Sequence, residues 1–151
     1  MDFKRLIILR KKKELSQREM ANVLGVSKST YARWETGEEI IPLKHFTNFC
    51  NYFNVTMDYV LGLSKKNEFN KYNYCKKIDK EKIGNNIKTL RKKNNLSQKD
   101  LANIFNTSQS TISAYENGKT LLLTIFAYQI AKKFNLSIDS LCDLEKEKVI
   151  E

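Results

Sequence analysis

One pattern of about 60 residues occurs twice in this sequence, and this internal repeat limits the possible folds more than any other feature. Residues 3–63 align with residues 84–144 without a gap. The segment Leu-Arg-Lys-Lys-x-x-Leu-Ser-Gln at 9–17 returns at 90–98, and Ser-x-Ser-Thr at 27–30 returns at 108–111. Stacked solenoid repeats are shorter, so this period indicates two copies of a complete folding unit. We therefore expect two domains, 1–63 and 83–145, with a basic connector at 64–82 and a tail at 146–151.

Hydrophobic periodicity and capping signals predict that each copy is all-α. The residues Ser16 to Glu19 have the capping-box pattern at the start of a helix. Gly25 is matched by Asn106, and both residue types tolerate a positive φ, which indicates a tight turn at this point in each copy. The expected helices are 3–13, 17–24, 28–36, 42–53 and a short one from 57 in the first copy, and 84–94, 98–105, 109–117, 123–134 and 138–143 in the second.

The net charge of +10 is shared by both domains and the connector. A spread positive field attracts polyanions, either nucleic acid or acidic lipid, and charge alone does not choose between them. The sequence has no stretch of about 20 apolar residues and does not begin with a signal-peptide pattern. We therefore expect a cytoplasmic protein without a membrane partner.

The three cysteines form no Cys-x-x-Cys pair, so we expect neither a disulfide framework nor a metal site. Cys50 aligns with Ala131, which favours a small core residue over a ligand or nucleophile. No catalytic pair, triad or phosphate loop can be assembled around His45, the one histidine. We expect no enzyme, no cofactor and no small-molecule substrate.

The second and third expected helices of each copy are short and are joined by a turn of three or four residues. This arrangement describes a helix-turn-helix motif, which binds DNA. An ordinary helical hairpin within a bundle has the same outline, so this geometry alone leaves both interpretations open.

Residues 15–37 have the pattern Leu-Ser-Gln-x-x-Met-Ala-x-x-Leu-Gly-Val-Ser-x-Ser-Thr-x-x-x-Trp-Glu-x-Gly. This pattern resembles the lambda/434 repressor and Cro family of XRE-type helix-turn-helix proteins. The counterpart at 96–118 resembles it too, and the segments 54–62 and 135–141 are similar to the closing helix of the family. The resemblance implies two tandem five-helix lambda-repressor-like domains that bind double-stranded DNA as a transcriptional regulator, expected to be a repressor. The alternative is an antitoxin-like or adaptor module that uses the same fold for protein interaction with little base reading.

The resemblance also implies which residues meet DNA, because the third helix of such domains enters the major groove. In the first copy the base-reading positions hold Lys28, Ser29 and Arg33, where the basic side chains suit guanine. In the second copy they hold Gln109, Ser110 and Ala114, where glutamine suits adenine and alanine suits a thymine methyl group. The two readers therefore differ, and we expect half-sites that are not mirror copies.

The resemblance further implies that Gln17 and Gln98 hydrogen-bond backbone phosphate. The glutamine that begins the second helix lies at a helix N-terminus, where free N–H groups and the helix dipole favour anions. The implied DNA-contacting residues beyond the base readers are Gln17, Ser27, Thr30 and Lys44 in the first copy and Gln98, Ser108 and Ser113 in the second.

Two further features recur or differ between the copies. Arg10 with Glu35, and Arg91 with Glu116, match a pair that bridges the first and third helices in the family, and we expect a structural brace in preference to a weak surface ion pair. The second copy departs from the first at 120–126, which is too apolar for a good phosphate contact. We expect a homodimer or inter-domain interface there, against a locally enlarged core; its residues would be Leu121, Leu122, Ile125 and Tyr128. Aromatic residues in the connector indicate partial order, such as an extension of the next helix.

Overall fold

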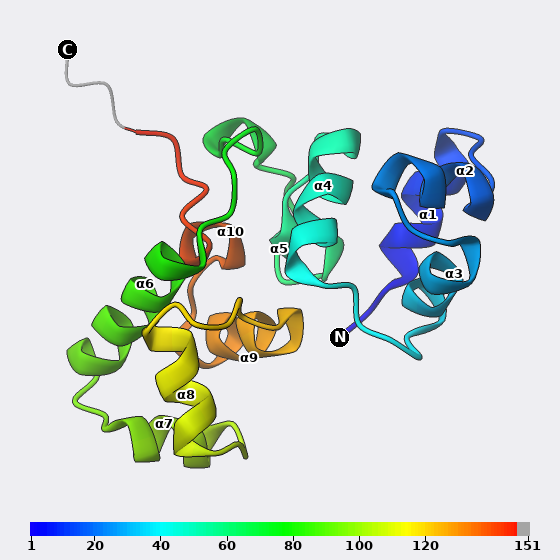
Figure 1. Cartoon of the computed structure of the whole chain (residues 1–151). Coiled ribbons are helices and arrows are strands. Elements are labelled where there is room, and N and C mark those ends of the chain that lie inside the picture. The colour runs from blue at the N-terminus through cyan, green and yellow to red at the C-terminus, as the bar shows by residue number, and fades with distance from the viewer. Residues whose placement is uncertain (148–151) are drawn as a thin grey trace. The chain divides into compact units, whose positions relative to one another are not determined.

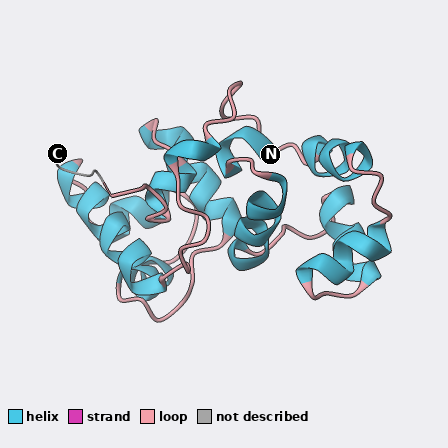
Figure 2. Ribbon diagram, turned by 90° about the horizontal axis from the view of Figure 1, so that it is seen from above, coloured by secondary structure: helices cyan, strands magenta, loops and turns pink. Residues whose placement is uncertain are grey.

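The computed structural model describes residues 1–147, and these form helices and loops without a β-strand (Figure 2). This confirms the all-α fold class. The chain divides into two compact units, Met1–Cys75 and Lys76–Glu151. Most of the tail expected at 146–151 lies outside the described residues.

The helices of both units follow the predicted order (Figure 1). The first unit contains α1 (Lys4–Lys12), α2 (Gln17–Leu24), α3 (Lys28–Thr36), α4 (Leu43–Phe53), α5 (Met57–Val60) and a 3-10 turn, η1 (Phe69–Lys71). The second contains α6 (Lys80–Lys93), α7 (Gln98–Ile104), α8 (Gln109–Glu116), α9 (Thr124–Phe134) and α10 (Ile138–Leu141).

Side-chain caps and left-handed residues set the helix boundaries that the sequence predicts. Ser16 and Glu19 form the capping box of α2: the Glu19 N–H donates to the serine hydroxyl at 3.1 Å, and the Ser16 N–H donates to the carboxylate at 2.7 Å. Gly25 ends α2 with a φ of 69°, and Asn106 takes a φ of 53° at the equivalent position. The tight turn between the second and third helices is therefore present in both units.

Each unit is built on one apolar core beneath its third helix. In the first unit the fully buried side chains include Leu6, Met20, Tyr31, Phe46 and Phe49. Cys50 is also fully buried, and its counterpart Ala131 is 3% exposed, which confirms the prediction of a small core residue.

The expected connector is divided between the two units. Residues 64–75 belong to the first unit, where the Tyr74 hydroxyl accepts a hydrogen bond from the Met57 N–H at 3.0 Å and the Tyr74 ring stacks on Phe69. Residues from Lys76 onward belong to the second unit, where Lys76 pairs with Asp143 at 2.8 Å. The aromatic residues that indicated partial order are thus part of a folded unit.

The helix predicted at 84–94 begins earlier, at Lys80, because Asp79 caps it by accepting hydrogen bonds from the N–H groups of Glu81 and Lys82. The extension brings Glu81 over Gly118, and Gly84 lies against the end of α8. A Cβ atom on Gly84 would stand 2.2 Å from the Tyr115 carbonyl oxygen, so only glycine allows α6 and α8 to pack this closely.

Candidate nucleic-acid interface

Helix α3 has one face buried in its domain and one face in solvent. Ser27 caps it by accepting from the Thr30 N–H at 3.2 Å. Tyr31 and Trp34 are 0% and 2% exposed and fix the helix to the core. The opposite face carries the expected base readers, and all of them are exposed: Lys28, Ser29 and Arg33.

Helix α8 is built in the same way in the second unit. Ser108 caps it through the Thr111 N–H at 3.2 Å, and Ile112 and Tyr115 are buried. On the outer face the side chains of Gln109 and Ser110 are exposed, while Ser113 and Ala114 are half-buried.

A small cluster of hydroxyl groups marks the N-terminus of each of these helices. The Ser27 hydroxyl lies 3.1 Å from that of Ser29 and 2.8 Å from that of Thr30. The same contacts in the second unit measure 2.9 and 2.8 Å, from Ser108 to Ser110 and Thr111. The clusters present both donors and acceptors beside the expected base readers, as polar recognition would require.

The structure brings Arg10 and Glu35 together in a bidentate pair between α1 and α3. Arg10 Nε and Nη2 lie 2.5 and 3.1 Å from the two carboxylate oxygens of Glu35. In the second unit Arg91 and Glu116 repeat this pair at 2.5 and 3.2 Å. All of these side chains are buried, so the pairs differ from the weak surface ion pairs that were the alternative.

The two glutamines expected at phosphate extend these networks. Gln17 Nε2 donates to Glu35 at 2.9 Å, and Gln98 Nε2 donates to Glu116 at 2.9 Å. An amide nitrogen carries two hydrogens, so each glutamine has one that the bond to the carboxylate does not use. This contact with the carboxylate was not predicted, although Gln17 and Glu35 have the same spacing in the sequence as Gln98 and Glu116.

The networks hold both carboxylates ionised. Burial alone would raise the pKa of Glu35, but hydrogen bonds from Arg10 and Gln17 outweigh it and lower that pKa below its ordinary value of 4.5. The pKa of Glu116 is lowered in the same way, by Arg91 and Gln98 against the effect of burial. An ionised carboxylate near the C-terminus of α3 therefore ties that helix to Arg10 of α1, and one near the C-terminus of α8 ties it to Arg91 of α6.

Two basic side chains at the edge of the α3 face have different surroundings. Lys44 is exposed in the first turn of α4. Arg33 makes an ion pair with Glu39 in the loop that follows α3, with Nη1 2.8 Å from Oε1. Glu39 was not predicted as a partner of Arg33.

The apolar segment between α8 and α9 differs from the expected interface in one residue. Leu122 is 2% exposed and occupies the core position that Ile41 fills in the first unit, so it does not belong to an exposed surface. Leu123, which was not predicted, is instead 53% exposed. The apolar sequence allows either Leu122 or Leu123 to point inward. Leu122 does so, because it is at the position that matches buried Ile41. Leu121, Ile125 and Tyr128 are half-buried.

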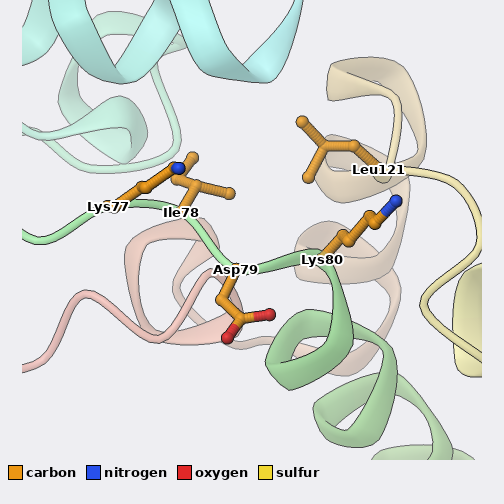
Figure 3. Close-up of a pocket in the computed structure, with 5 residues that line it drawn as sticks. All are labelled: Lys77, Ile78, Asp79, Lys80 and Leu121. Atoms are coloured by element: carbon orange, nitrogen blue, oxygen red, sulfur yellow. The ribbon is translucent and has the colours of Figure 1, made fainter.

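Leu121 lines a pocket of the second unit, where it faces Ile78 across the space between the segment before α6 and the segment before α9 (Figure 3). The amine of Lys80 extends toward Leu121, and Lys77 lies beside Ile78.

Among residues 1–147, no cluster of histidine, cysteine or acidic side chains could hold a metal ion. None of the helices described for this chain has the length and apolar character needed to cross a bilayer.

Comparison with known families agrees with this geometry. The helix-turn-helix family profile matches the chain twice, over residues 6–60 and 87–141. The chain is a tandem member of the XRE-type helix-turn-helix family. Each match runs from the first to the last helix of one repeat, with the braced third helix inside it.

Several known proteins match stretches of 55 to 68 residues, about the length of one repeat. The chain is 38% identical over 68 residues to the HTH-type transcriptional regulator AnsR of Bacillus subtilis, covering 45% of this chain and 59% of AnsR. It is 44% identical over 55 residues to the antitoxin PezA of Streptococcus pneumoniae, covering 36% of this chain and 35% of PezA. An HTH-type regulator of B. subtilis, YobD, is 33% identical over 60 residues, 40% of this chain and 54% of YobD. The chain thus spans about a third to three fifths of these relatives, and no solved structure matches it.

Proposed function

We propose that this protein is a sequence-specific transcriptional regulator, a repressor, that reads duplex DNA with the exposed faces of α3 and α8. The observation that carries this proposal is the duplication of one arrangement: a capped third helix, buried on one side and bridged near its end to an arginine of the first helix. A rigid helix with a polar outer face suits the major groove. The net charge of +10 supplies the attraction to the DNA backbone.

The side chains on the two faces suggest different base preferences. Lys28 and Arg33 on α3 suit guanine, because lysine and arginine donate to its O6 and N7 atoms. Gln109 on α8 suits adenine, and Ala114 offers apolar contact to a thymine methyl group. One chain would therefore recognise two unlike half-sites.

The phosphate-binding set would surround these readers. Gln17 and Gln98 would each donate their second amide hydrogen, with the N-terminus of the helix that each begins. Lys44 is exposed in a position to add a cation, and the hydroxyls of Ser27, Thr30, Ser108 and Ser113 would add neutral contacts. In this proposal the arginine–glutamate pairs act as braces that orient the reading helices and do not touch DNA.

Selection of bound duplexes from a random pool by the intact chain tests the proposal. We expect one enriched site with two unlike arms, preferred over unrelated duplex by at least about 10³-fold. Affinity should also fall as salt rises, with a slope in log affinity against log salt of about −0.9 for each lysine or arginine that neutralises a phosphate. Enrichment of no sequence would refute the proposal, and a perfect palindrome would mean that one repeat per chain reads DNA in a symmetric dimer.

A second candidate is an antitoxin-like or adaptor protein. The similarity to a protein named as an antitoxin, PezA, favours it. In that case DNA binding would be weak and blind to sequence, and the exposed face of α3 would contact a protein. The selection experiment separates the two candidates.

We also propose that the second unit makes a homodimer through the apolar surface formed by Leu121, Leu123, Ile125 and Tyr128. The supporting observation is the 53% exposure of Leu123, a large apolar side chain where the first repeat has Pro42. Light scattering of the intact chain should give twice the monomer mass, and Leu123→Asp should restore the monomer. A monomeric wild-type chain at high concentration would remove this part of the proposal.

A further inference from the structure

Glu39 is held beside Arg33 by both its side chain and its backbone. Its carboxylate Oε1 lies 2.8 Å from Arg33 Nη1, and its N–H donates to the Arg33 carbonyl oxygen at 3.2 Å. Gly37, with a φ of 78°, reverses the chain after α3 and so allows this return. The backbone contact therefore places the Glu39 carboxylate next to one particular side chain of the reading face, in an ion pair that is exposed to solvent.

The second repeat lacks both members of this ion pair. Ala114 stands at the position of Arg33, and Thr120 stands at the position of Glu39. The backbone contact also moves by one residue, so that the Lys119 N–H donates to the Ala114 carbonyl at 3.0 Å. The first repeat thus has both the arginine and the carboxylate, and the second repeat has neither.

The Glu39 carboxylate affects which further acceptors the Arg33 guanidinium can bind. Arginine has five N–H donors, and Glu39 engages Nη1, which leaves donors on Nε and Nη2 for a second acceptor. Guanine O6 and N7 are neutral acceptors and can share the guanidinium with a carboxylate. A backbone phosphate is an anion, and a carboxylate on the same guanidinium repels it.

We propose that Glu39 is a specificity-determining residue, which orients Arg33 toward base edges and disfavours its use on backbone phosphate. This inference rests on the proposed function, because it assumes that α3 reads DNA. Glu39 lowers the affinity for unrelated DNA more than the affinity for the selected site, and so it raises the ratio between them.

The experiment compares Glu39→Gln with Glu38→Gln in the intact chain. Both variants remove one negative charge from the same exposed loop, but Glu38 makes no ion pair with Arg33. Affinities are measured for the duplex selected by the wild-type chain and for an unrelated duplex of equal length. Because an exposed ion pair is weak, we expect Glu39→Gln to lower the ratio of the two affinities by about two- to fivefold. Glu38→Gln should strengthen both affinities alike and leave the ratio unchanged.

The outcomes that overturn the inference are distinct from those that overturn the proposed function. Equal ratios for the Glu39→Gln and Glu38→Gln variants would overturn the inference alone. So would a further loss of preference when Glu39→Gln is added to Arg33→Ala, because Glu39 would then act through another group. A wild-type chain that prefers no sequence would overturn the proposed function itself. Fluorescence of the buried Trp34 reports whether each variant keeps the fold of the first unit.

Discussion

Replacing Glu35 by glutamine removes a buried charge and keeps the size of the side chain. The Glu35 carboxylate accepts three hydrogen bonds, from Arg10 Nε and Nη2 and from Gln17 Nε2, at 2.5, 3.1 and 2.9 Å. Glutamine keeps one oxygen, and its amide nitrogen would face donors where an acceptor is needed. The guanidinium of Arg10, which is 8% exposed, would be left without its counter-charge.

Removal of one partner from a buried ion pair costs about 3 to 5 kcal/mol. Arg10 retains its hydrogen bond to the Leu15 carbonyl oxygen at 2.7 Å and is 8% exposed. We therefore expect a loss at the low end, about 3 kcal/mol. A folding unit of the size of Met1–Cys75 has a total stability of about 4 to 11 kcal/mol, so this loss is a large part of it.

Urea unfolding followed by tryptophan fluorescence measures this loss in the first unit. Trp34 is the one tryptophan in the chain, is 2% exposed and precedes Glu35. With a denaturant slope of about 1.5 kcal/mol per molar, the urea midpoint should fall by about 2 M. The matched variant Glu116→Gln should leave the Trp34 transition unchanged, because Glu116 is hydrogen-bonded to Arg91 and Gln98 of the second unit.

The pH dependence of the same transition provides an independent check. The lowered pKa of Glu35 means that the unfolded chain binds more protons, so the stabilisation is complete above about pH 4.5 and is lost as pH falls through the folded pKa. Glu35→Gln should remove this part of the acid dependence. Replacing both partners, as Arg10→Met with Glu35→Leu, should restore most of the stability. A midpoint shift below about 0.5 M for Glu35→Gln, or a double variant no more stable than the single one, would refute the reasoning.

Three further predictions test other parts of the structure. Gly84→Ala should lower the unfolding free energy of the second unit by about 1 to 3 kcal/mol, because the new Cβ would meet the Tyr115 carbonyl oxygen at 2.2 Å. Urea titrations followed by circular dichroism measure this loss, and an unchanged stability would disprove the close packing. Burial lowers the pKa of His45, so its stabilising contribution is present above pH 6.5 and is lost as pH falls through the folded pKa. His45→Phe, which copies Phe126 of the second repeat, should abolish this pH dependence in unfolding followed by fluorescence. A pH dependence that persists in the variant would assign it to another group. Lys28→Ala should cost about 1 to 3 kcal/mol of discrimination at one base position in competition binding, whereas a uniform loss over all sequences would make Lys28 a phosphate contact.

The sequence predicted the fold well because its signals were local and occurred twice. The capping box at Ser16, the left-handed residues Gly25 and Asn106, and the hydrophobic periodicity each depend on a few neighbouring residues. The structure confirms these features. The early start of α6 depends on Asp79, whose capping role was hidden in a segment interpreted as a connector.

Contacts between distant residues were harder to predict. The family resemblance implied the pairing of Arg10 with Glu35, but the bond from Gln17 to that carboxylate depends on how α2 packs against α3. The ion pair of Arg33 with Glu39 depends on the path of the loop after Gly37, which periodicity does not encode. The burial of Leu122 beside exposed Leu123 follows from a core position in three dimensions.

Chemical-shift mapping by NMR, with the intact chain and its selected duplex, addresses the major-groove assignment most directly. The largest changes should fall on Lys28, Ser29 and Arg33 of α3, with smaller ones at the N-terminus of α8. Unchanged signals along α3, with perturbations gathered on the apolar surface around Leu123, would contradict the account.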